Sequence, residues 1–184
     1  MSKVISFGLS VESIETAIAE IRQYQQELEQ KCERFVRELI DEGITVGRSA
    51  SAGADYGGYL VFTSEVSGAK SMVTGVMCVT ESGIIHSEWL QADGSYKTAD
   101  VSPLLMVEFG SGQHAQNPKN IEGVGRGTFP GQTHAFQPGW WYATGPMSNP
   151  EWHYSTGYKP SQPVYKASVA MFEAINKVAQ RVFA

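Results

Sequence analysis

Cysteine and long apolar runs are both scarce in this sequence, and each shortage excludes a class of protein. The 184 residues include two cysteines, Cys32 and Cys78, which are too few and too far apart for a zinc knuckle or a CxxC redox motif. Both lie in apolar-patterned segments, so we expect buried free thiols in a reducing compartment. No apolar stretch approaches the roughly 20 residues of a membrane-spanning helix. The first residues do not follow the pattern of a signal peptide, so we expect synthesis in the cytoplasm.

Basic residues are also few. Lys and Arg number 14 against 19 Asp and Glu, which leaves a net charge of −5. Nucleic-acid binders usually present a basic face, so sequence-specific binding of nucleic acid is not expected. The acidic excess is concentrated in residues 1–42, where nine acidic residues stand against five basic ones. Hydrophobic residues make up 42%, which is enough for a soluble domain with a core.

A long amphipathic helix is expected over residues 11–41. Apolar residues recur there at alternating spacings of four and three, with Gln25 as the polar interruption. Ser10 is the expected N-cap and Gly43 the expected end. An average helix has only about 11–12 residues, so this one is expected to project beyond a single core or to brace another subunit. The apolar stripe, which we expect to be buried, consists of Ile14, Ile18, Ile21, Leu28, Cys32, Phe35 and Leu39.

Small residues at 47–58 predict a flexible loop, and β-structure is expected after it. Three segments, 59–66, 70–82 and 84–91, are rich in β-branched and aromatic residues and are bounded by Gly, Ser or Asp. The Asp93-Gly94 pair is a hairpin signal, so the chain should reverse there and return through Tyr96. Three or four antiparallel strands are the expected result.

Residues 101–162 have a different composition. All eight prolines lie between Pro103 and Pro163, and glycines punctuate the same stretch. Disordered linkers are poor in aromatic residues, whereas eight aromatic residues lie between Phe129 and Tyr158. We therefore expect a long ordered loop that has a function or forms an interface. The stretch GWWYAT at 139–144 could form a strand within it.

A second amphipathic helix is expected from Val164 to about Val182. Pro160 and Pro163 fix where it begins, and Ser161 is the nearest candidate for its cap. Its expected buried stripe consists of Val164, Ala167, Met171, Ile175, Val178 and Val182.

The candidates for catalysis are the four histidines together with Glu108 and Glu151. No HExxH or HxxxH spacing places two metal ligands on one helical face, so a metal site would need His114, His134 and His153 to converge in space. A zinc-dependent hydrolase of cell-wall material that uses these three histidines stays open as an alternative. No GxSxG nucleophile motif is present, and the glycine-rich GVGRGTFPG at 123–131 lacks the Lys-Ser/Thr of a phosphate loop.

The stretch MVEFGSGQHA at 106–115 has two interpretations. Glu108 and His114 could be an acid and a base at the mouth of an active site. Alternatively, Glu108 accepts hydrogen bonds at the end of a strand or short helix, and Gly110 and Gly112 turn the chain into the loop that follows.

The clustered aromatic residues leave three alternatives open. Trp and Tyr are enriched at the hot spots of protein interfaces, so a subunit or partner interface is the hypothesis we favour. Flat rings also pack against sugar faces, which makes a carbohydrate-binding module using Trp140 and Trp141 an alternative. Packing within the protomer is the third. The expected interface residues are Phe129, Phe136, Trp140, Trp141, Tyr142, Trp152 and Tyr154.

Two short motifs, together with the order of the expected elements, resemble the tail-completion family of long-tailed bacteriophages and prophages, whose members are also called head–tail joining or neck proteins. The family's Val/Glu-Phe-Gly-Thr-like stretch is matched by Val107–Ser111, and its Pro-x-x-Pro-Phe-like stretch by Pro160–Ala167. An Asp-Thr-Gly-like segment is echoed only by Thr45–Ser51, and Gln113–Tyr158 is far longer than the usual link between the motifs. The matched residues with an expected structural role are Glu108, Phe109, Gly110, Pro160, Pro163 and Lys166.

The resemblance implies a structural component of the virion with no catalysis or cofactor, and it favours the structural interpretation of Glu108. The chain would assemble as a homo-oligomeric ring, taken to be a hexamer, between the head-side adaptor or portal and the tail terminator or tube. The expected fold is α+β in a single domain over 1–184, with a helix at 1–42 and a small antiparallel sheet at 59–109 packed against both helices. A long aromatic loop at 110–160 and a helix at 161–184 complete it.

Overall fold

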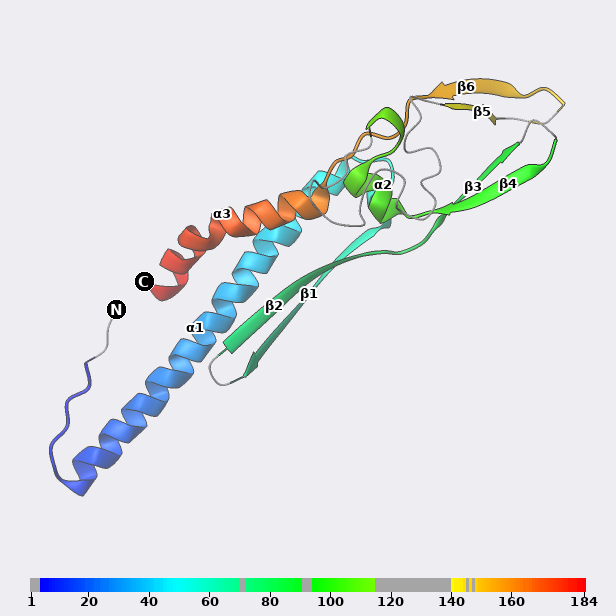
Figure 1. Cartoon of the computed structure of the whole chain (residues 1–184). Coiled ribbons are helices and arrows are strands. Elements are labelled where there is room, and N and C mark those ends of the chain that lie inside the picture. Colours follow the sequence, from blue (N-terminus) through cyan, green and yellow to red (C-terminus); the bar gives the residue numbers. More distant parts are fainter. Residues whose placement is uncertain (1–3, 70–71, 91–93, 115–139, 145, 147) are drawn as a thin grey trace. The chain divides into compact units, whose positions relative to one another are not determined.

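The computed structural model describes residues 4–69, 72–90, 94–114, 140–144, 146 and 148–184 (Figure 1). The fold is α+β, as the sequence predicted. The chain divides into two compact units, of which Met1–Thr45, Thr63–Cys78 and Ser168–Ala184 form the first, and Val46–Phe62 and Val79–Ala167 the second. A single domain over 1–184 stays a prediction. The elements in chain order are α1 (Val11–Ala52), the 3-10 turn η1 (Gly57–Tyr59), β1 (Leu60–Ala69), β2 (Met72–Glu81), β3 (Ile85–Leu90), β4 (Tyr96–Val101), α2 (Pro103–Phe109), η2 (Gly112–His114), β5 (Trp140–Thr144), β6 (Glu151–Ser155) and α3 (Pro163–Phe183).

Helix α1 is longer than predicted. It begins after Ser10, whose Oγ accepts the backbone N–H three residues later at 3.3 Å, as expected of an N-cap. Gly43 does not end the helix, which continues to Ala52, so the predicted loop at 47–58 is wrong for its first half. Gly47, which lies within the extended helix, serves packing instead. A Cβ at Gly47 would lie 2.5 Å from the ring of Phe62, so glycine is needed for this close approach.

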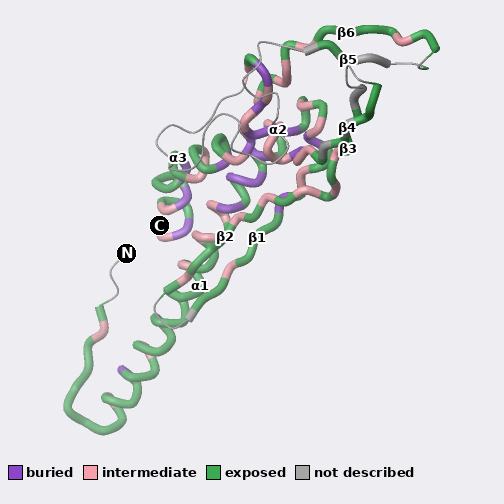
Figure 2. Tube along the Cα trace, turned by 45° about the vertical axis from the view of Figure 1, so that its right-hand side comes forward, coloured by how far each residue is buried: buried purple, intermediate pink, exposed green. Residues whose placement is uncertain are grey.

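The N-terminal half of α1 is exposed, which contradicts the prediction that its whole apolar stripe is buried (Figure 2). The side chains of Ile14, Ile18, Ile21 and Leu28 are 40%, 44%, 53% and 42% exposed. The physical reason is length: α3 has 21 residues against 42 in α1, so it can cover only part of the stripe. A charge introduced at Ile21 would therefore face solvent rather than a core.

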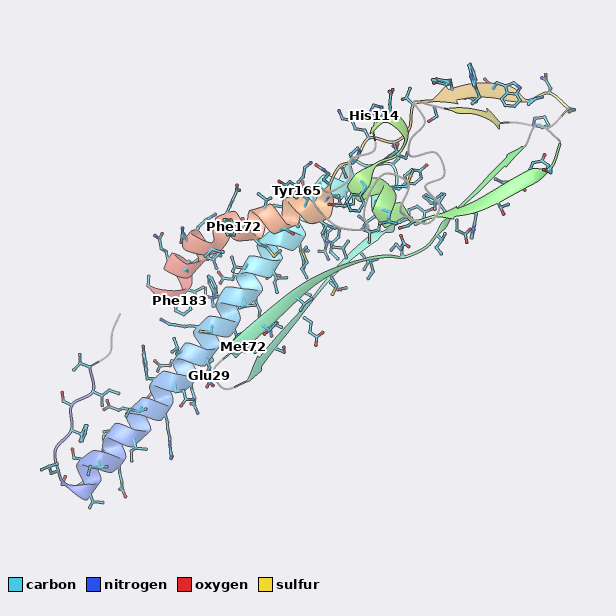
Figure 3. All side chains as sticks on the ribbon, in the orientation of Figure 1. Glu29, Met72, His114, Tyr165, Phe172 and Phe183 are labelled. Atoms are coloured by element: carbon cyan, nitrogen blue, oxygen red, sulfur yellow. The ribbon has the colours of Figure 1, made fainter. Side chains whose placement is uncertain are left out.

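The core of the first unit lies between the later part of α1 and α3. The rings of Phe35 and Phe183 meet there at 5.8 Å, and Figure 3 shows Phe183 at the end of α3. Ile175, expected in the buried stripe of α3, is 38% exposed, because Ala174 occupies the buried side of that turn. The buried residues and the half-buried residues packed on them are Ala174, Val178, Val182, Phe35, Leu39 and Phe183.

An ion-pair cluster also links the two helices of this unit. Arg34 lies 2.7 Å and Arg181 2.6 Å from the carboxylate of Glu38. The hydrogen bonds from Arg34 and then Arg181 lower the pKa of Glu38 below its usual value, because they favour the charged carboxylate.

The strands of the described residues form three two-stranded sheets, β1–β2, β3–β4 and β5–β6. Strand β2 passes so close to α1 that a Cβ at Gly75 would clash with Val36 and Ile40, so the strand packs on the helix as predicted. The predicted hairpin after β3 is confirmed by the antiparallel pairing of Leu90 with Tyr96. The strand predicted in GWWYAT is confirmed as β5, and β6 pairs with it inside the predicted loop.

Two other predictions need correction. Residues 103–109, expected at the end of the sheet, form α2, because Ser102 caps this helix and Pro103 presets φ at its first position. Cys78 is exposed and Cys32 only half-buried, so the expectation of two buried thiols is wrong.

No helix in the part of the chain that the structure describes is both long and apolar enough to cross a bilayer.

Candidate functional site

Glu108 joins α2 to the beginning of α3 within the second unit. The residue is only 9% exposed, and its carboxylate accepts the N–H of Val164 at 2.8 Å and that of Tyr165 at 3.1 Å. Pro163 occupies the first position of α3 and has no N–H, so these two groups are the first unpaired donors of the helix. The carboxylate also faces the positive end of the helix dipole. Glu108 therefore caps the N-terminus of α3.

Ser161, the expected cap of α3, does not fill this role. Its hydroxyl is buried and has no hydrogen-bond partner among the described residues. The cap comes instead from Glu108, which precedes Val164 by 56 positions. A pattern confined to the sequence around residue 161 could not reveal it.

Backbone hydrogen bonds join the same two segments. The Val107 carbonyl accepts the N–H groups of Ser161 and Gln162 at 2.9 and 3.2 Å. The Ser111 N–H donates to the Tyr158 carbonyl at 2.9 Å, and the Ser111 hydroxyl accepts the Tyr158 N–H at 2.9 Å. The two motifs that carry the family resemblance thus lie side by side, although they are far apart in the sequence. We call this region the Glu108 joint.

Two glycines permit the close contact of these segments. Gly110 has a φ of 72°, and a Cβ there would lie 2.6 Å from the Tyr158 carbonyl oxygen and 2.7 Å from Pro160 Cδ. Gly157 has a φ of 102°, and a Cβ there would clash with the backbone of Ser111. Both positions require glycine for conformation and for space. The sequence pattern indicated Gly110 but gave no signal for Gly157.

The other residues matched to the family lie around the joint. Phe109 and Pro160 are half-buried, and Pro163 is among the largest fully buried side chains. Lys166 is exposed, and its N–H donates to the Gln162 carbonyl at 3.0 Å, which starts the helical hydrogen bonding of α3. Its charge therefore points to solvent rather than to the carboxylate of Glu108.

A second carboxylate caps α2. Glu81, at the end of β2, accepts the Ser102 hydroxyl at 2.6 Å and the Leu104 N–H at 3.2 Å through the same oxygen. Ser102 Oγ in turn accepts the Leu105 N–H at 3.2 Å. Sequence reasoning missed Glu81, because its partners are again distant in the chain.

Tyr158 closes one side of the joint. Its ring lies 5.4 Å from that of Tyr56. Burial, and then the negative charge of Asp55, raise the pKa of Tyr158 above its usual value, because both disfavour the phenolate.

The β5–β6 sheet carries an exposed aromatic face. Trp141 lies opposite Tyr154, with ring centroids 5.1 Å apart, and Trp152 lies opposite Ala143. Because alternate residues of a strand point to one face, Trp141, Trp152 and Tyr154 share it. They are 65%, 54% and 52% exposed. We call these three residues the aromatic face.

The side chains of Trp140 and Tyr142, and the whole of Phe129 and Phe136, lie outside what the structure describes.

The histidines of the described residues do not form a metal centre. No group of three or more His, Cys, Asp or Glu side chains there could hold a metal ion. His114 lies in η2, and His153 lies 3.9 Å from Glu151 on β6. His134, the third histidine of the hydrolase alternative, lies outside the described residues. The hydrolase alternative stays a hypothesis.

No protein-family model, curated protein or solved structure matches this chain. In the joint both oxygens of Glu108 are engaged by backbone N–H groups, which is the chemistry of a helix cap. The aromatic face presents large apolar area to solvent, which is the chemistry of recognition.

Proposed function

We propose that this chain is a non-catalytic structural component of a bacteriophage or prophage virion, a tail-completion or neck protein that joins tail to head. Copies of the chain form a ring, a hexamer if it follows the symmetry of a tail. The ring meets the head-side adaptor or portal on one side and the tail terminator or tube on the other.

The observation that carries the proposal is the aromatic face. Three large rings stand together on a two-stranded sheet, each more than half exposed. Full burial of such a side chain is worth roughly 2–3 kcal/mol, so a partner that covers this face gains affinity from it. Trp and Tyr are also the residues that most often dominate binding energy at protein interfaces. An assembly protein needs a surface of this kind.

The Glu108 joint supports the same proposal. It brings together the two motifs that resemble the tail-completion family and gives each of them a structural use. The Glu108 carboxylate is the acceptor for α3, and Gly110 permits the contact with Tyr158 and Pro160. These contacts support a structural rather than a catalytic role for both motifs.

The test is deletion of the coding sequence from the bacteriophage or prophage genome that carries it, followed by electron microscopy of the lysate. The proposal predicts DNA-filled heads and finished tails that remain unjoined. Complementation with Trp141→Ala/Tyr154→Ala should fail to restore joined particles. Complementation with Tyr96→Ala, which removes a ring that is 51% exposed on a different hairpin, should restore them. Normal particles without this chain would contradict the proposal.

The aromatic face also favours a second candidate, a carbohydrate-binding module. Exposed tryptophans on one face of a sheet can stack on sugar rings as well as on a protein. Binding to a glycan array that is lost in Trp141→Ala would support this candidate. Normal tail joining by that same variant would then favour the sugar-binding function over the structural one.

A further inference from the structure

The exposed part of α1 carries a heptad repeat. From Ile14 to Cys32 the positions of the stripe alternate by four and three residues, an average of 3.5 that continues through Phe35 and Leu39. A strict 3.5-residue repeat keeps an apolar seam facing a partner helix in a left-handed coiled coil. In the later part of α1 the partner is α3, through Phe183 and its neighbours. The earlier part has the same seam.

No described part of the chain buries the earlier seam. From Val11 to Lys31 the only buried residue is Ala17. Glu29, labelled in Figure 3, lies on the part of α1 that extends past the end of α3 at Phe183. The seam residues of this part, Ile14, Ile18, Ile21 and Leu28, are 40–53% exposed. Such a regular row of exposed apolar side chains is a surface on which another helix can pack.

We infer that the segment from Ile14 to Cys32 pairs, parallel and in register, with the same segment of another copy of this chain. The register follows from Gln25, the one polar seam position. In a parallel, aligned pair each Gln25 meets Gln25 of the other copy, and the amides can hydrogen-bond to each other. A shift by one heptad would place this amide against Ile18 or Cys32. An antiparallel pair would place it against Ile21.

The charges beside the seam favour the same orientation. Glu15, Arg22 and Glu29 flank one side of it. An antiparallel pair that overlaps the whole seam brings Glu15 near Glu29 and Arg22 near Arg22 of the other copy, so like charges meet. In the parallel pair the flanking neighbours are Arg22 with Ala17 and Glu29 with Tyr24, so no like charges meet. The avoidance of like charges therefore favours a parallel pair.

The single chain can accommodate Gln25 at the seam. Its Nε2 donates to Glu29 Oε1 at 3.2 Å, four residues along the same helix. A side-chain amide has a second N–H and a carbonyl oxygen with which to pair across the seam. Gln25 can thus keep its bond to Glu29 and still meet a second copy.

This inference adds a specific contact between copies to the proposed ring, and it does not depend on what the ring joins. Light scattering of the purified full chain should give a mass of two or more chains. Ile21→Asp should become monomeric and keep its helical circular dichroism. Gln23→Asp, which places the same charge two residues later on the outer side of the helix, should associate like the original chain. A monomeric original chain, or equal association of Ile21→Asp, would overturn the inference.

Cysteine cross-linking tests the orientation even if Ile21→Asp fails to fold. In a Cys32→Ser/Cys78→Ser background, Leu28→Cys should form covalent dimers under mild oxidation, whereas Gln30→Cys on the outer side should not. Ile14→Cys in that background, mixed with a chain that keeps Cys32 and carries Cys78→Ser, should give no mixed dimer. A mixed dimer of these two chains would show an antiparallel pair and refute the parallel one. Both measurements use the isolated chain, so their failure is distinct from failure in tail joining.

Discussion

Replacing Glu108 by alanine removes the acceptor for two backbone donors at once. The Val164 and Tyr165 N–H groups that begin α3 lose their partner at 2.8 and 3.1 Å. Pro163, at the first position of α3, has no N–H, so these two groups are the first backbone donors of the helix. The substitution also leaves a small void, since Glu108 is only 9% exposed.

The expected loss follows from these contacts. Removal of an N-cap costs about 0.5–2 kcal/mol, and hydrogen bonds to a charged group contribute about 1.5–3 kcal/mol each. Both hydrogen bonds are only partly buried, so water can reach the freed donors in part and the upper sum does not apply. We therefore expect Glu108→Ala to lower the free energy of unfolding by about 2–3 kcal/mol, or the Tm by roughly 5–10 °C.

The assay is urea unfolding followed by circular dichroism, with two comparison variants. Glu108→Gln has nearly the same shape but keeps only one acceptor oxygen, so it should lose about half as much. Glu173→Ala removes an exposed glutamate from α3 itself and should stay within about 0.5 kcal/mol of the original chain. If Glu108→Ala unfolds with the same midpoint as Glu173→Ala, the joint does not depend on this carboxylate and the reasoning fails.

Three further predictions concern conformation and pH. Gly110→Ala should cost more than Gly94→Ala, by about 1–3 kcal/mol in urea unfolding, because both glycines have positive φ but only Gly110 has atoms that a Cβ would strike; equal losses would contradict this. The raised pKa of Tyr158 gives a contribution to stability that is fully present below pH 10 and is lost as pH rises through the pKa of the folded state. Tyr158→Phe should therefore flatten the alkaline limb of a plot of stability against pH. The lowered pKa of Glu38 acts in the opposite direction: its contribution is present above pH 4.5 and should be lost as pH falls through the folded value, so an unchanged acid limb in Glu38→Gln would refute its role.

Local patterns in the sequence predicted most of the elements. Helix α3 and the long N-terminal helix follow from apolar periodicity, and β5 follows from an aromatic run between turns. Periodicity shows which face of a helix is apolar but not what covers it. For that reason Phe35 and Ile21 were expected to be equally buried, whereas α3 reaches only Phe35.

The candidate site was accessible from the sequence only in part. Glu108 and Gly110 stood out because they interrupt an apolar run just before a turn. Glu81 and Gly157 gave no comparable signal, since each acts through partners that are distant in the chain. A helix normally takes its cap from the preceding residues, so Ser161 was the expected choice. Tertiary packing supplied a buried carboxylate instead.

The central claim, that this chain is an assembly component of a virion neck, is tested most directly by its copy number in finished particles. Particles of the bacteriophage or prophage that encodes the chain would be purified, and this chain would be counted against the portal protein by quantitative mass spectrometry. The claim predicts a fixed number of copies in every preparation, and six per particle if the ring is the hexamer expected from tail symmetry. Infectious particles that contain none of this chain would contradict it.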